Sequence, residues 1–182
     1  MRREDGCIAH RVALASCALL IVAGCASKPS PDAFERDYDD ESKTWKEIET
    51  QLPLAARDGD LAQFYVSPVS PYRFSLDRKS LALGADGVYR YTLVAVSREG
   101  ARNVSYEGIR CATREYKIYA IGRSDGTWIK ARNAQWRPVV EVDNNRQHAE
   151  LIKDYLCIDS RVPRNLASVN ETLNKGPPPP LP

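Results

Sequence analysis

The chain has 182 residues, with 26 Lys and Arg against 24 Asp and Glu. This length fits a single domain with a substantial core. The near-neutral charge does not favour nucleic-acid binding, which calls for a clustered basic face, so we expect no nucleic-acid partner.

The first 24 residues have the pattern of an export signal. Three arginines precede an apolar run at 12–23 that is too short to cross a bilayer as a helix. The run ends in VAGC, which resembles the bacterial lipobox, where the cysteine is lipidated and becomes the mature N-terminus. The sequence therefore predicts a lipoprotein signal peptide at 1–24 and a lipid on Cys25. The alternative is an ordinary buried cysteine in a short membrane anchor.

The residues after Cys25 indicate where the protein resides. Ala26 and Ser27 follow the cysteine, without the Asp that in bacterial lipoproteins favours retention in the inner membrane. We expect a protein of the bacterial cell envelope, anchored through its lipid in the outer membrane and facing the periplasm. Residues 25–41 are polar and contain two prolines, so we interpret them as the lipidated N-terminus and a tether.

A short N-terminal helix is predicted next. Ser42 can cap it, Trp45, Ile48 and Leu52 follow at i, i+3 and i+7, and Pro53 ends it. The alternative is a disordered acidic stretch that continues through this region.

Hydrophobic periodicity changes to two between residues 61 and 140. Strand-like runs are LAQFYV, YRFSL, SLAL, VYRYTLVAV, VSYEGIRC, EYKIYAIG and TWIKA. The turn Gly84-Ala85-Asp86-Gly87 is a hairpin signal. These runs predict a mostly antiparallel sheet of about five or six strands.

A second helix is predicted from Asn145 to Cys157. Its apolar face contains His148, Leu151, Ile152 and Tyr155. We expect this C-terminal helix to pack on the sheet, which gives an α+β fold with a single domain at 42–160. Residues 161–182 end in a run of prolines and are predicted to form a flexible proline-rich tail.

The five cysteines divide by position. Cys7 and Cys17 lie within the signal, and Cys25 is assigned to the lipid. Cys111 and Cys157 remain as an even pair in an oxidising compartment, so a disulfide between them is predicted. The alternative is a free, reactive Cys111.

The block from 101 to 139 contains a series of distinctive motifs, RNV, YEGIRC, EYK and ARNAQW, in that order. These motifs resemble the cryptic neisserial protein (CNP)-like family of proteobacterial envelope proteins, and the match extends from about Trp45 to Cys157. The resemblance implies an exported protein, in line with the lipobox. It implies no activity or catalytic residue.

The same block supplies the candidate ligand-binding residues. Aromatic and charged side chains alternate there, as in grooves that bind sugars or peptidoglycan fragments: Tyr106, Glu107, Arg110, Arg132, Asn133 and Trp136. On a pleated strand Glu107 and Cys111 share one face, while Tyr106 and Arg110 share the other. A buried Glu107 needs a partner, and Arg114 or Arg132 is the expected one.

Catalytic hypotheses are less well supported. Glu107 and Glu115 could act as the acid and base of a glycoside hydrolase, and Cys111 with His148 could form a thiol dyad. The mature chain has one histidine and neither a zinc motif nor a phosphate-binding loop, so no metal or cofactor is predicted.

Three functional hypotheses follow. The first is an uncharacterised envelope lipoprotein that acts as a non-enzymatic binding or structural module for an envelope protein or for peptidoglycan. The second is a cell-wall-active hydrolase that uses Glu107 and Glu115, or a free Cys111. The third is a carrier of a small ligand, with an aromatic pocket between sheet and helix.

Overall fold

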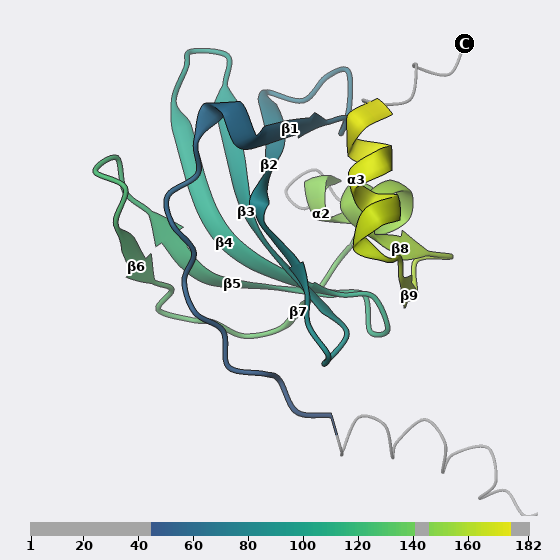
Figure 1. The fold of residues 1–182 in the computed structure, drawn as a ribbon. Helices are drawn as coiled ribbons and strands as arrows, with labels where there is room; N and C mark the ends of the chain where they lie inside the picture. The colour runs from purple at the N-terminus through teal and green to yellow at the C-terminus, as the bar shows by residue number, and fades with distance from the viewer. Residues whose placement is uncertain (1–44, 141–145, 176–182) are drawn as a thin grey trace, which may run out of the picture. The chain divides into compact units, whose positions relative to one another are not determined.

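The structure, a computed structural model, describes residues 45–140 and 146–175, and it contains one main sheet with helices packed on one face (Figure 1). The sheet has seven strands, six of which lie side by side in chain order. They are β1 (Leu61–Phe64), β2 (Tyr72–Leu83), β3 (Val88–Ser97), β4 (Arg102–Arg110), β5 (Glu115–Gly122) and β6 (Trp128–Lys130). The seventh, β7 (Arg137–Pro138), pairs with β5, and a 3-10 turn (Asp58–Asp60) precedes β1. Every pairing is antiparallel, so the predicted α+β class and sheet are confirmed.

The hairpin between β2 and β3 forms at the predicted turn. Gly87 has a φ of 74°, and its N–H donates to the carbonyl of Gly84 at 3.0 Å. Two predicted short strands, YRFSL and SLAL, are a single strand, β2, with a register shift between Asp77 and Ala82.

The helical layer consists of three helical segments, with a small hairpin between the second and the third. Helix α2 (Arg146–Glu150) continues as a π-helical segment, η3 (Leu151–Leu156), and leads into a small hairpin of β8 (Cys157–Ile158) and β9 (Val162–Pro163). Helix α3 (Leu166–Lys175) follows. The helix predicted at 145–157 is therefore confirmed in its described part, 146–156.

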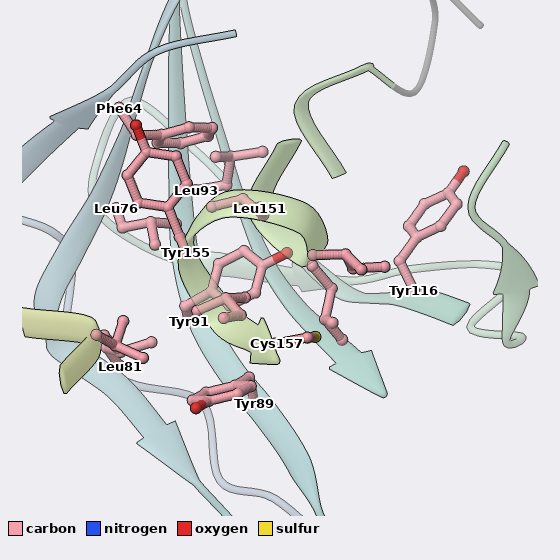
Figure 2. Close-up of a cluster of buried hydrophobic side chains, with 14 of the residues drawn as sticks. Phe64, Leu76, Leu81, Tyr89, Tyr91, Leu93, Tyr116, Leu151, Tyr155 and Cys157 are labelled. Atoms are coloured by element: carbon pink, nitrogen blue, oxygen red, sulfur yellow. The ribbon is translucent and has the colours of Figure 1, made fainter. Parts of the chain in front are cut away.

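The hydrophobic core lies between the sheet and this helical layer (Figure 2). Leu76, Tyr91 and Ile109 from the strands meet Leu151 and Ile152 of η3, and each is fully buried. Burying such a side chain contributes about 1.5–3 kcal/mol relative to leaving it exposed. This apolar contact fixes the helical layer over one face of the sheet.

The predicted disulfide is confirmed. Cys111, just after β4, is bonded to Cys157 at the start of β8, with a sequence separation of 46 residues. A crosslink over a loop of this length contributes on the order of 4 kcal/mol in the chain-entropy account. It ties the end of β4 to the end of η3.

The predicted N-terminal helix is wrong in its described part. Residues 45–57 contain neither helix nor strand. The backbone N–H of Ile48 donates to the Asp86 carboxylate at 2.9 Å, and Trp45 donates its indole N–H to the carbonyl of Asp86 at 2.9 Å. Contacts with the β2–β3 turn thus replace helical hydrogen bonds. Ser42, the predicted cap, lies outside the described residues.

The tail predicted at 161–182 is wrong over its described part. Val162 lies in β9, and α3 occupies Leu166–Lys175 with Val169 and Leu173 buried against the core. The Asn165 side chain accepts a hydrogen bond from the N–H of Ser168 at 2.8 Å, as an N-cap residue does. The proline run lies outside the described residues. Within the described ranges, no helix is long and apolar enough to cross a membrane.

Candidate functional site

An extended segment, residues 45–57, crosses the face of the sheet opposite the helices, and we call it the strap (Figure 1). Trp128 in β6 donates its indole N–H to the carbonyl of Pro53 at 2.8 Å. The hydroxyls of Thr50 and Tyr106 lie 3.1 Å apart. Both faces of the central strands are therefore covered, one by helices and the other by the strap.

Glu47 of the strap makes several hydrogen bonds to side chains of the sheet and of the segment before β7. Its carboxylate accepts hydrogen bonds from Lys117 at 2.7 Å, from the Tyr119 hydroxyl at 2.7 Å and from the Trp136 indole at 3.2 Å. Burial alone would raise the pKa of Glu47, but the hydrogen bonds from Lys117 and Tyr119 and the charge of Lys117 outweigh it and lower the pKa. This cluster attaches the strap to the sheet.

The six candidate ligand-binding residues do not form one groove. Tyr106, Arg110 and Trp136 lie under or beside the strap, with the Arg110 guanidinium 4.0 Å above the ring of Trp45. Arg132 and Asn133 are exposed in the turn before β7. Glu107 points to the opposite, helix-covered face, as the alternation with Tyr106 predicted.

Glu107 is buried, and its partner is a histidine. Glu107 and His148 are each 2% exposed, and Nε2 of His148 lies 2.8 Å from Oε2 of Glu107. Ser105 donates to Oε1 at 2.6 Å, and the Tyr91 hydroxyl lies 3.4 Å from Oε2. The expected partner, Arg114 or Arg132, was therefore wrong, because the partner comes from α2.

The tautomer of His148 follows from its hydrogen bonds. Nε2 must carry a hydrogen to donate to the carboxylate, while Nδ1 is buried and has no hydrogen-bond partner among the described residues. The imidazole ring also stacks on Tyr116, with the ring centroids 4.0 Å apart. The Glu107 carboxylate thus lies in a buried position with its hydrogen bonds made to side chains of the sheet and of α2.

The effect of the Glu107 carboxylate is visible at Tyr91. Burial raises the pKa of Tyr91, and the neighbouring Glu107 carboxylate raises it further. Tyr91 thus remains a protonated donor toward Glu107.

One pocket opens beside this pair, and we call it the Glu107 pocket. It has a volume of about 520 Å³ and lies between β2–β4, the loop after β1 and the start of α2. Phe74, Leu93 and Ala95 form part of its apolar wall, while Ser105 and Glu107 form its polar end. An apolar cavity with a few converging polar groups is the usual form of a small-molecule site.

A second pocket, which we call the arginine pocket, lies on the strap side. It measures about 670 Å³, and its lining includes Arg57 of the strap, Arg102 of β4, Arg123 after β5 and Trp128, together with two acids, Asp58 and Asp125. Arg102 pairs with Asp58 at 2.7 Å. The three cations come from separate elements, so the fold alone brings them together.

The structure does not place the residues of either catalytic hypothesis where the proposed chemistry needs them. Glu115 lies opposite Arg110 in the β4–β5 register, so it is on the strap face, whereas Glu107 is on the helix face. Cys111 is bonded to Cys157 and is not available to His148 as a thiol. Within the described ranges, no group of three His, Cys, Asp or Glu side chains could hold a metal ion.

Comparison with known proteins identifies the family to which the chain belongs. The family model described as "CNP1-like family" matches residues 40–174. The chain is also similar to "Cryptic neisserial protein 1" of Neisseria gonorrhoeae (strain ATCC 700825 / FA 1090), with 33% identity over 75 residues. That alignment spans 35% of this chain and 37% of the relative, so it covers well under half of either protein. No solved structure matches the chain.

Several residues at these sites were missed in the sequence. Glu47 was assigned to a helix, and Ser105 and Arg57 were not considered. A partial signal existed only for His148, the one histidine on the apolar face of the predicted helix. A helix that packs on a sheet with such a residue requires a polar partner on the sheet, but the sequence does not indicate which residue supplies it.

Gly108 in β4 lets Tyr119 reach Glu47. A Cβ at this position would lie 2.7 Å from the Tyr119 hydroxyl, so we expect Gly108→Ala to displace that ring and to destabilise the fold by about 1–3 kcal/mol. Urea unfolding measures the change. Gly59→Ala is the matched control, because a Cβ there has no heavy atom within 4 Å. Equal stability of both variants would show that the Tyr119–Glu47 contact is not important.

The Glu47 cluster makes a pH-dependent contribution to stability. Because folding lowers the pKa of Glu47 from its ordinary value of 4.5, the contribution is complete above that value and is lost as pH falls through the folded pKa. We expect Glu47→Gln to be clearly less stable than the wild type at pH 7, and the gap to narrow below about pH 4.5. Urea unfolding at several pH values tests this. The exposed neighbour variant Glu49→Gln should show no such trend.

Proposed function

The chain belongs to the CNP1-like family, and from its pockets we propose that it is a lipid-anchored, non-enzymatic binding protein of the bacterial envelope. The observation that carries this proposal is the arginine pocket, an open hollow whose lining includes three arginines and a tryptophan. Binding, rather than catalysis, is the activity that this arrangement supports.

The reactive groups of the described residues are already engaged. Glu107 is held by His148 and Ser105, Glu47 by Lys117 and Tyr119, and Cys111 by its disulfide. A general acid or base must reach a substrate proton, and a nucleophile must be free to attack. These groups instead stabilise the fold, which favours a binding role over the hydrolase alternative.

The arginine pocket suits an anionic envelope component. Arg57 and Arg123 are exposed at its rim, and arginine forms paired hydrogen bonds with carboxylates. Trp128 is half-buried and offers an aromatic surface for the apolar face of a sugar. Fragments of peptidoglycan combine sugars with peptide carboxylates, so we propose peptidoglycan as the ligand and an envelope protein as the alternative.

The lipid anchor would hold this pocket near its target. We propose that Cys25 carries the lipid, that 25–41 is the tether, and that the protein sits in the outer membrane and faces the periplasm. The strap follows the proposed tether in the sequence, and its contacts with Asp86 and Lys117 hold the strap on the domain.

Loss of Cys25 should release the protein from the membrane. We expect wild-type protein expressed in a Gram-negative host to incorporate labelled fatty acid and to sediment with outer-membrane vesicles, and Cys25→Ser to do neither. Density fractionation with fatty-acid labelling measures both. Cys17→Ser is the control, and labelling that persists in Cys25→Ser would contradict the lipidation proposal.

Purified peptidoglycan sacculi should retain the protein through the arginine pocket. We expect the double variant Arg57→Ala/Arg123→Ala to bind sacculi at least tenfold more weakly, because each lost charge-assisted contact contributes about 1 kcal/mol or more. Co-sedimentation at several salt concentrations measures the affinity.

The matched control for this experiment removes two other exposed arginines, Arg73 and Arg78 of β2, which lie outside the pocket. It changes the net charge equally, so a similar loss would indicate only nonspecific charge attraction. Release of soluble fragments during the incubation would contradict the non-enzymatic role.

A further inference from the structure

We propose that the Glu107 pocket is a second, separate site, which binds a small cationic amphiphile, that is, an ammonium group on an apolar body. The pocket and the arginine pocket have no lining residue in common. The two proposals can therefore succeed or fail independently.

The charge at the polar end of the pocket is the first argument. Glu107 is a buried acid that contributes to the pocket wall, where it accepts a hydrogen bond from Ser105 and lies 2.8 Å from Nε2 of His148. A ligand ammonium at this end of the pocket would be attracted by the acid, whereas a ligand anion would be repelled.

The other charged residue of the lining, Arg146, is paired with an acid of its own helix. Arg146 lies at the mouth of the pocket, with its side chain 48% exposed and its Nε 3.8 Å from the Glu150 carboxylate. Its charge is therefore shared with an acid of its own helix. The polar end of the pocket remains acidic.

The position of Ser105 gives access to the carboxylate. Ser105 is half-buried, lines the pocket and donates to Oε1 of Glu107 at 2.6 Å. The hydroxyl oxygen can accept from a ligand N–H while its own hydrogen stays on Glu107. An ammonium at this point would bind Ser105 directly and Glu107 at short range.

The side walls of the pocket indicate that the rest of the ligand is apolar. Val66, Tyr72, Phe74, Leu93 and Ala95 present an apolar surface, and Tyr72 is 39% exposed along it. The volume of about 520 Å³ accommodates a body of the size of an aromatic ring with a short chain. The site thus combines an acidic end with an apolar wall, the counterpart of a cationic amphiphile.

Binding of 2-phenylethylamine to the purified protein with its disulfide intact tests the proposal, with 3-phenylpropionate as the anionic probe of similar body. Titration calorimetry gives the affinities, and amide chemical shifts locate the site. We expect the amine to bind, with shifts at Ser105 and Gln147, and the anion to bind at least tenfold more weakly. No amine binding, or equal affinity for both probes, would overturn the proposal.

Two variants distinguish a loss of amine binding from a loss of folding. Glu107→Gln retains the shape of the side chain and can still accept a hydrogen bond from His148. We expect it to weaken amine binding at least tenfold. The control Glu115→Gln, on the opposite face of the sheet, should leave amine binding unchanged. If Glu107→Gln does not fold, Ala95→Phe decides, because it fills the wall and leaves the Glu107–His148 pair in place. If the folded Glu107→Gln variant, or Ala95→Phe, binds the amine as tightly as the wild type does, the proposed site is refuted.

Discussion

Strand β4 lies between two covering layers, and its alternation determines what each layer contacts. Tyr106 and Arg110 point to the strap, whereas Glu107 and Cys111 point to the helices. The same strand therefore holds the strap through aromatic contacts and holds the helical layer through an ion–imidazole pair and a disulfide. A one-residue shift in its register would exchange the two sets and break both layers.

The Glu107–His148 pair is an unusual choice for the contact between helix and sheet. A pair of apolar residues of similar volume could hold the helical layer at equal or greater stability, because a buried polar pair must offset its desolvation. Here Ser105 and Tyr91 complete the hydrogen bonds of the carboxylate, and within the pair only Nδ1 of His148 has no partner among the described residues. The acid also contributes to the wall of an open pocket, where an apolar pair would place no polar group.

The sequence predicted the features that depend on local pattern. Alternation identified the strands and the two faces of β4, Gly84–Gly87 identified the hairpin, and the count of cysteines identified the disulfide. It could not predict the partner of Glu107, because His148 is 41 residues away and reaches it only after the helix packs. The strap was mistaken for a helix because Trp45 and Ile48 have helical spacing, although both are held by Asp86. Helix α3 was missed because its short apolar pattern precedes a proline run that indicates a tail.

Both pockets open at the same end of β4, and the covering layers explain why. Burial falls along this strand from Tyr106–Ile109, which is buried, to Val104 and Ser105, which are half-buried, and to Arg102 and Asn103, which are exposed. Val104 lines the arginine pocket, and its neighbour Ser105 lines the Glu107 pocket on the other face. The strap and α2 contribute to the pocket linings but leave this end of the strand partly exposed, so each face has a hollow. Alternate residues of one strand enter the two pockets, Arg102 and Val104 on one face and Ser105 and Glu107 on the other, and this separation keeps the two proposed sites chemically distinct.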